Sequence, residues 1–415
     1  MKKSLRVGIG VLGVFVFLLV SVVTFAQTTE ITIWFGRENF IPADRFETFH
    51  AENPHIRIKI DMIPLEEALA AYVRTFRAGN PPDIFQVLHQ NPTALAAQKM
   101  VMDITPILKA WEEEDPDDFR DMAKAAWEMP SYQGVPYGMA LHAAPYWYVW
   151  RSDLFDEAGI PEPETWDDAL DAGRKLRSDT MLGYALIGHK PHIDWFVSYF
   201  VSMGGPFVNN LIQLDSDAGV YLLGWYQTMM RDGIVHPDTP AWDSGEARAA
   251  FMAGKAAQMF QGSNIFAKIQ ESLEYKKQWK AKPPLYRPGA KDSWRMGGIC
   301  WPYMVSISAS VKQDAVRKVF QYLSRTEIVK EVALRYQPAT RMSVFREPDY
   351  LEFQPWYAEL FEAYSRQYPI PVHLRDTEIY RVLAEARHEA LTNVNADPKE
   401  MAARYQAQIN KIAGQ

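Results

Sequence analysis

ITIWFGREN, residues 31–39, alternates apolar and polar side chains and then ends on a glycine and a charged pair. Ile31 and Ile33 follow the two-residue period of a strand that buries one face. The polar residues that come next would stand at the tip of that strand. The stretch therefore predicts a scaffold strand that delivers Trp34 and charged side chains to its carboxyl end.

The chain after this strand alternates helices with strands. We expect a short helix behind Pro42, a strand over 56–60, a helix over 65–76 that ends before Gly79, and a strand over 83–88. Strands that alternate with helices form mostly parallel, doubly wound sheets. Ligands of such sheets collect outside the carboxyl ends of the strands, which nominates the tips at 36–38 and 89–91.

Residues 1–26, MKKSLRVGIGVLGVFVFLLVSVVTFA, join a basic start to an apolar run that closes on small residues near Ala26. This pattern is typical of a secretory signal peptide, with cleavage after Ala26. An uncleaved membrane anchor is the alternative, because the apolar run approaches the length that spans a bilayer. No cysteine stands near the cleavage site, so we expect a periplasmic protein that is not a lipoprotein.

The charge and the length of the chain restrict its classes of partner and its number of domains. The chain has a formal net charge of −7, and loss of Lys2, Lys3 and Arg6 with the signal segment would make it −10. This acidity argues against nucleic acid and anionic membrane surfaces as partners. The single cysteine, Cys300, leaves no internal disulfide, and the length suits two domains rather than one.

The remaining chain predicts a second unit of the same class. An extended, aromatic-rich segment over 135–155 would cross between the two units, and no internal repeat or low-complexity linker is evident. We expect a helix over 163–176, with Thr165 as its N-cap and Asp168 completing a capping box. Residues 243–260 should form a helix that stops at Gly254, followed by a strand. A strand over 303–308, a helix over 312–336 and a last helix after Asp397 and Pro398 complete the expected elements.

Catalytic signatures are missing from the sequence. It contains no P-loop, no GxSxG elbow and no HExxH motif, so we expect neither an enzyme nor a cofactor. A carboxylate pair for glycoside hydrolysis stays open, because such pairs meet in space rather than in sequence. His189, His192 and Asp194 have the chemistry of a metal cluster, but histidines exposed on a proline-containing loop are the commoner outcome.

Four tryptophans lie beside predicted element boundaries and polar residues: Trp34, Trp195, Trp242 and Trp301. A sugar has an apolar face on which flat aromatic rings can stack, and a rim of hydroxyls that amides, carboxylates and arginines can bind. Each tryptophan could also be an ordinary core residue with its indole N–H satisfied. Four such positions together favour a carbohydrate site.

Four stretches of the chain carry a combined pattern: AGNPPDIFQV…MVMDITP (78–106), YQGVPYGMA…YVWRSDLFDEAGIPEPETWDDAL (132–170), FMAGKAAQMFQGS (251–263) and YMVSISASVKQDAVRKVFQYLSRTE (303–327). Taken together, they resemble the family 1 extracellular solute-binding proteins of carbohydrate ABC transporters. The resemblance implies a two-lobed periplasmic-binding-protein fold that closes on a ligand and docks, as a monomer, on a membrane permease. Lobe one would comprise 28–140 plus 303–336, and lobe two 141–302 plus 337–415.

The resemblance also implies where ligand is bound. The family's contacts fall on loops after the first and third strands, on the crossing segment, on an aromatic cluster in lobe two, and on the chain after the strand near 260. Together with the tryptophans, the candidate residues are Trp34, Gly36, Arg37, Glu38, Gln90, Asn91, His142, Tyr146, His192, Asp194, Trp195, Trp242, Ser263, Asn264, Trp301 and Arg341.

One departure from the family bears on the ligand. Relatives often carry a stacking tryptophan after the strand near 260, where this chain has Gln261 to Asn264. This disfavours a maltodextrin and favours a smaller or differently shaped sugar. Arg37 and Arg341 leave open an anionic ligand such as a glycerol phosphate or a uronate, since guanidinium groups suit phosphate and carboxylate. Arg341 could equally form an interlobe salt bridge, and a secreted carbohydrate-active enzyme is the remaining alternative.

Overall fold

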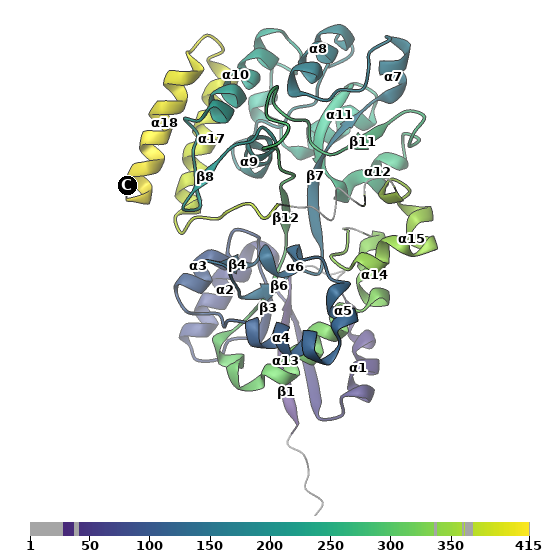
Figure 1. Ribbon diagram of the computed structural model, residues 1–415, viewed down its shortest axis with the longest axis vertical. Helices are drawn as coiled ribbons and strands as arrows, with labels where there is room; N and C mark the ends of the chain where they lie inside the picture. The colour runs from purple at the N-terminus through teal and green to yellow at the C-terminus, as the bar shows by residue number, and fades with distance from the viewer. Residues whose placement is uncertain (1–27, 37–40, 336–337, 359–360, 362–367, 415) are drawn as a thin grey trace, which may run out of the picture.

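The computed structural model describes residues 28–36, 41–335, 338–358, 361 and 368–414. The expected signal segment 1–26 and the candidate residues Arg37 and Glu38 lie outside the described residues. Two α/β lobes are stacked in the remainder, with strands passing from one to the other (Figure 1). The α/β class and the two-lobed arrangement predicted from the sequence are therefore confirmed.

Lobe one is built on a five-stranded sheet. Its order is β2 (Ile56–Met62), β1 (Thr29–Phe35), β3 (Ile84–Gln86), β13 (Tyr303–Val305) and β6 (Gly138–Met139). The β1 strand runs parallel to β2 and β3, and its Ile31 and Ile33 are fully buried. Among these five strands, β13 alone runs opposite to the others, because the chain reaches it from lobe two; it pairs antiparallel with β3 on one side and with β6 on the other. The predicted strand at 31–33 thus forms the centre of the first core.

Helices and short strands cover this sheet. They are η1 (Ala43–Arg45), α1 (Phe46–Glu52), α2 (Leu65–Arg77), α3 (Pro92–Ala97), α4 (Thr105–Glu114), α5 (Pro116–Arg120), α6 (Ala125–Glu128), β4 (Ser131–Tyr132), β5 (Val135–Pro136), η4 (Ile307–Lys312), α13 (Gln313–Leu323) and α14 (Thr326–Arg335). Tyr72 of α2 stacks on Phe85 of β3, so the apolar face predicted for that helix packs against the sheet.

Lobe two is organised around β7 (Ala143–Trp150), in which every residue is buried. It pairs antiparallel with β10 (Gln258–Gly262), β11 (Lys280–Lys282) and β12 (Gly298–Cys300). This differs from the mostly parallel sheet predicted for lobe two. The reason is that β7 carries the chain into the lobe and the other three strands return along it. Among the described residues of lobe two, parallel pairing is limited to isolated bridges, such as that of Ala185 to Met259.

The other elements surround this sheet or continue the chain to its end. They are α7 (Ser152–Glu157), α8 (Trp166–Leu176), α9 (Ile193–Ser202), β8 (Phe207–Val208), β9 (Leu211–Ile212), α10 (Asp217–Arg231), η2 (Thr239–Ala241), α11 (Ser244–Met252), η3 (Ser263–Ile265), α12 (Phe266–Gln270), η5 (Met342–Arg346), α15 (Pro348–Phe353), α17 (Asp376–Thr392) and α18 (Pro398–Ala413). The capping box of Thr165 and Asp168 is confirmed, as is the stop at Gly254, whose φ of 69° lies in the left-handed region.

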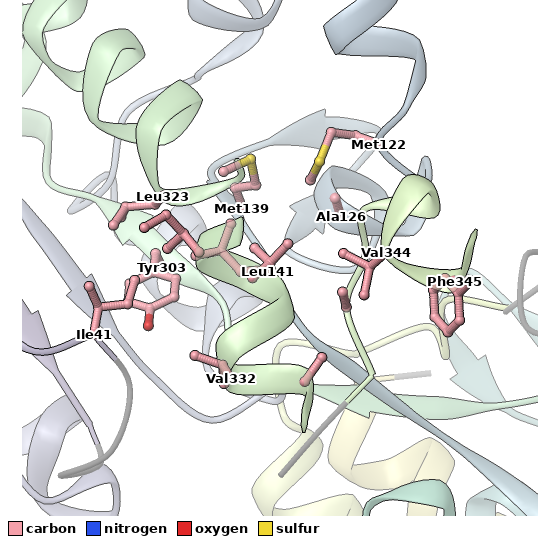
Figure 2. Packing of buried hydrophobic residues seen from close by; sticks show 14 of the residues in the cluster. Ile41, Met122, Ala126, Met139, Leu141, Tyr303, Leu323, Val332, Val344 and Phe345 are labelled. Atoms are coloured by element: carbon pink, nitrogen blue, oxygen red, sulfur yellow. The ribbon is translucent and has the colours of Figure 1, made fainter. Parts of the chain in front are cut away.

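The junction of the lobes is held by more than the crossing strands β7 and β12. Ala339 bridges to His142, and Arg341 bridges to Met122, so the chain just after residue 337 stays beside lobe one. Figure 2 shows apolar side chains from the segments around 122–141 and 323–345 packed in one cluster. Among the described helices, none combines the length and the apolarity needed to cross a membrane.

Candidate functional site: a divided interlobe cleft

A chamber of about 140 Å³ opens where the crossing strands enter lobe two, and we call it the inner chamber. It is lined by Ala144 and Tyr146 of β7, Ile299 and Trp301 at and after β12, Trp195 of α9, Arg248 of α11, and Gln261, Gly262 and Asn264 at the end of β10. Four residues proposed from the sequence, Tyr146, Trp195, Asn264 and Trp301, are therefore brought together. Residues from distant parts of the chain meet here because β10 and β12 both pair with β7.

Aromatic rings and unpaired polar groups share the walls of the inner chamber. The rings of Tyr146 and Trp195 meet edge to face with centroids 5.2 Å apart, and the Trp195 indole donates to the carbonyl of Phe260 at 3.1 Å. The Tyr146 hydroxyl and the Gln261 amide nitrogen are buried without a hydrogen-bond partner among the described residues. Because buried polar groups are almost always satisfied, a polar molecule in the chamber could provide the partners of these two groups.

Electrostatics keep the Tyr146 hydroxyl protonated. Burial, and then the nearby carboxylate of Asp194, raise its pKa well above the usual value. The hydroxyl therefore remains available as a hydrogen-bond donor. None of the described residues that line the inner chamber is acidic, and Arg248 adds a cation whose Nε donates to the carbonyl of Ser244 at 2.7 Å.

A second cavity, of about 320 Å³, lies between the tip of β3 and α17, and we call it the outer groove. It is lined by Gln90, Lys190, Pro191, Ile193, Asp376, Thr377, Tyr380, Arg381, Ala384 and Glu385. The side-chain oxygen of Gln90 is buried and has no described hydrogen-bond partner. The Asp376 carboxyl accepts from the backbone N–H of His373 at 3.1 Å, and burial raises its pKa to about 7. Gln90 is the one candidate predicted from the sequence that lines this groove.

One cross-lobe contact stands between the two cavities. Nε2 of His89, in lobe one, lies 3.1 Å from Oδ1 of Asp194, in the first turn of α9. Burial lowers the pKa of His89, but the carboxylates of Asp194 and Asp376 outweigh it and leave the pKa above its ordinary value. Asp194, a predicted ligand residue, is thus bound to the opposite lobe in this structure.

The loop before α9 is held by a buried arginine of α17. Arg387 has no exposed surface, and its guanidinium donates to the carbonyls of His189 and His192, each at 2.6 Å. The His192 ring lies 5.4 Å from that of Trp195, although it does not line either cavity. Arg387 therefore positions the loop from which Asp194 and Trp195 project.

Two candidate residues prove to be core residues. Trp34 is buried between α2 and the sheet, in a cluster with Tyr72 and Phe85, so it is scaffold and not a sugar platform. His142 is buried at the junction of the lobes, where its Nε2 lies 3.2 Å from the carbonyl of Val329. Burial lowers the pKa of His142 to about 4, so the ring is neutral. Both predictions of ligand contact are corrected by this packing.

Arg341 and Trp242 are also removed from the candidate site. Arg341 is buried and paired with Asp118 and with Asp121, whose Oδ2 lies 2.9 Å from Nε. An ion pair of Arg341 is therefore present, but its carboxylates come from lobe one, beside which residues 339–341 already lie, so the interlobe bridge considered from the sequence stays a prediction. Trp242 stacks on His236, with centroids 4.7 Å apart, and lines neither cavity.

The remaining candidates lie near the cleft without lining a cavity. The Gly36 N–H donates to Oε1 of Gln86 at 2.9 Å, and a Cβ there would meet Leu65 at 2.5 Å, so this glycine permits close packing. Asn91 is half-buried at the start of α3, without a capping hydrogen bond from its side chain. The Ser263 hydroxyl is buried with no described hydrogen-bond partner, one residue from Gly262.

Several cavity residues were missed by sequence reasoning. Arg248 follows an N-terminal capping box and looks in the sequence like an exposed helix residue, while Asp376 and Tyr380 belong to a helix with no motif. His89 belonged to a nominated strand tip, and that position was the one signal that could have identified it. Within the described ranges, no group of three or more His, Cys, Asp or Glu side chains is arranged to hold a metal ion.

Two periplasmic binding proteins are similar to this chain in sequence. The chain is 24% identical over 220 residues to a probable amino-acid ABC transporter periplasmic-binding protein of Sinorhizobium fredii, covering 50% of this chain and 48% of that protein. It is 28% identical over 170 residues to the sn-glycerol-3-phosphate-binding periplasmic protein UgpB of Escherichia coli (strain K12), covering 38% of each. The chain thus spans about half the length, or less, of these two relatives.

Solved structures share the fold over nearly the whole chain. The sugar-binding protein MalE of Xanthomonas citri superposes with a TM-score of 0.79 at 17% identity, covering 93% of this chain and 98% of that one. A cyclic alpha-maltosyl-1,6-maltose binding protein of Arthrobacter globiformis gives 0.76 at 18% identity, covering 93% and 99%. Residues 38–330 match the family described as bacterial extracellular solute-binding protein. The chain therefore belongs to the bacterial extracellular solute-binding protein family.

Proposed function

We propose that this chain is the substrate-binding component of an ABC importer and captures a small carbohydrate between its lobes. The observation that carries the proposal is the inner chamber, where tryptophan walls adjoin the unpaired Tyr146 hydroxyl and Gln261 amide. Aromatic faces suit the apolar face of a sugar, and donors suit its oxygens. Sugar-binding structures of the same fold support the assignment.

The proposed mechanism is a shift of population and involves no chemical step. A ligand in the cleft contacts both lobes only when they close, so its binding energy favours the closed form. Permease subunits would recognise that form after export of the chain across the cytoplasmic membrane. The protein would act as a monomer and return its ligand unchanged.

Thermal unfolding of the purified chain with a panel of neutral sugars tests this function. A ligand at about 100 times its Kd should stabilise the fold by roughly 2.7 kcal/mol, which gives a clear rise in Tm. Isothermal titration of each active compound then measures its Kd. Failure of every neutral sugar to bind would overturn the proposal, and recovery of a chemically altered sugar would favour the enzyme alternative.

Binding of an anionic ligand is the second candidate function, and Arg248 supports it. Its guanidinium lines the inner chamber, where no described lining residue is acidic, and such a wall suits a phosphate or carboxylate. The curated glycerol-3-phosphate-binding relative agrees with this alternative. Of the arginines that first suggested an anion, Arg341 is paired with two carboxylates and Arg37 lies outside the described residues.

Substitution of Arg248 separates the two candidates. Arg248→Gln should abolish binding of glycerol 3-phosphate or glucuronate if the ligand is anionic, and should change the affinity for a neutral sugar by only a few-fold. Arg174→Gln, at an exposed ion pair with Asp232 in lobe two, is the matched control. Titration of both variants with both ligand classes decides between the candidates.

A further inference from the structure

The contact between His89 and Asp194 joins the two lobes inside the cleft. His89 follows β3 in lobe one, and Asp194 belongs to the first turn of α9 in lobe two. The side chains are only 14% and 25% exposed, and their atoms lie 3.1 Å apart. Two groups at this distance on opposite lobes can meet only while the lobes are closed.

The immediate neighbours of this pair line different cavities. In α9, Ile193 faces the outer groove while Trp195 faces the inner chamber, and Asp194 is the residue between them. In lobe one, Gln90 next to His89 also lines the outer groove. The Asp194 carboxylate contributes to the raised pKa of Tyr146 on the inner side and of Asp376 on the outer side. The pair therefore stands between the cavities and close to both.

Electrostatics favour keeping the pair intact when a ligand binds. A ligand that drew His89 away would leave the Asp194 and Asp376 carboxyls, which interact electrostatically, without the imidazole that interacts with both. Removing one partner of a shielded ion pair is costly, because the remaining charge is left without compensation. A ligand that fits on one side of the pair avoids this cost.

The inner chamber has the size of a single ring. Its volume is about 140 Å³, and a cavity of about 150 Å³ in a protein core holds one benzene molecule. A second sugar ring would need the outer groove, and the route to it passes through His89 and Asp194.

We infer that the His89–Asp194 pair divides the cleft and selects a single-ring sugar over longer saccharides. The inference rests on the proposed function, because it concerns the size of the sugar that the same cleft takes. The inner chamber is the binding compartment, and the outer groove stays separated from it. His89 and Asp194 are then specificity-determining residues, although neither needs to form the principal contact with the ring.

The test is the ratio of affinities for mono- and disaccharides. Isothermal titration of the full chain uses D-glucose, D-galactose, D-mannose and D-xylose, and the disaccharides maltose, cellobiose, lactose and xylobiose. The wild type should bind at least one monosaccharide ten-fold or more tightly than its disaccharide. His89→Ala/Asp194→Ala removes both side chains without leaving a lone charge, and should reduce that ratio at least ten-fold, mainly through tighter disaccharide binding.

Two further variants keep the test decisive. Asp194→Asn retains the bulk of the partition but removes the charge that holds His89, so it should lower the ratio in the same direction by a smaller factor. This variant also provides a readout if the double variant fails to fold. Glu52→Ala/Arg325→Ala removes an ion pair on the exterior of lobe one and should leave the ratio unchanged. Equal wild-type affinity for both lengths, or an unchanged ratio in both the folded double variant and Asp194→Asn, would overturn the inference alone. Absence of binding to all eight sugars would instead overturn the proposed function.

Discussion

The inner chamber and the outer groove share one cleft but differ in chemistry. The chamber is walled by Trp195 and Trp301, and its unpaired groups include an amide nitrogen and a hydroxyl that can donate. The groove has the exposed Lys190–Glu385 ion pair at its rim and an unpaired oxygen of Gln90 in its wall. Aromatic faces with fixed donors suit a ring, whereas solvated ion pairs hold little binding energy. The contrast suggests that specificity lies in the chamber.

The largest effect should come from the chamber wall. Trp301 is buried and packs with Leu65 and Ala144, so Trp301→Ala should lower the free energy of unfolding by about 3–5 kcal/mol through the cavity it leaves. Urea denaturation followed by circular dichroism measures the change. Trp301→Phe, which keeps an aromatic ring, is the control and should lose much less. A loss below about 1 kcal/mol for the alanine variant would show that the wall is not packed as described.

The next largest effect should be a pH dependence of the free energy of unfolding, caused by Asp376 in the outer groove. The pKa of Asp376 is raised to about 7 by burial, above its ordinary value of 3.8, so the folded state holds a proton that the unfolded chain releases. Its contribution to stability is therefore fully present below about pH 4 and is lost as pH rises to about 7. Asp376→Asn should remove that loss, on the order of 1–3 kcal/mol.

Urea titrations at pH 4, 5.5 and 7 check the pH prediction. The wild type should lose more stability than Asp376→Asn across this interval, because only the wild type has the buried carboxyl. The matched control is Asp215→Asn, at an exposed residue of lobe two just before α10. Parallel pH profiles for the wild type and Asp376→Asn would contradict the assignment.

Much of the scaffold could be predicted from local sequence patterns. Ile31 and Ile33 alternate as a strand does, and the capping box of Thr165 and Asp168 marks the start of α8. These signals are local, since each depends on neighbours within a few residues. The antiparallel sheet of lobe two was mispredicted because its strands pair across about a hundred residues or more, as between Tyr148 and Phe260.

Residues of the site could be predicted from the sequence only where they follow the end of a strand. Gln90 and Asn264 follow the ends of β3 and β10 within four residues, and the structure places both at cavities. Trp34 also follows the alternation, but no sequence pattern tells which face of a strand end meets α2 and which meets the cleft. Arg248 and Asp376 lie on helices whose inward faces are decided by packing between distant segments.

A smaller effect isolates a hydrogen bond in the chamber. The Tyr146 hydroxyl has no described protein partner, so Tyr146→Phe should leave the free energy of unfolding unchanged or slightly higher. The same change should weaken sugar binding by roughly five- to ten-fold, which corresponds to about 1 kcal/mol for one hydrogen bond. Titration calorimetry measures the affinity and urea denaturation measures the stability. Unchanged affinity would place the bound sugar away from this hydroxyl.

The smallest effect should come from the rim of the groove. Lys190 and Glu385 are 41% and 48% exposed, with Nζ 2.6 Å from Oε2, so water and salt screen their attraction. Lys190→Ala should therefore change both the free energy of unfolding and the affinity for the sugar by no more than about 0.5 kcal/mol. Glu385→Gln serves as the matched variant from the other side of the pair. If either substitution weakened binding as much as Tyr146→Phe does, the groove would share the ligand, and the contrast between the two cavities would no longer hold.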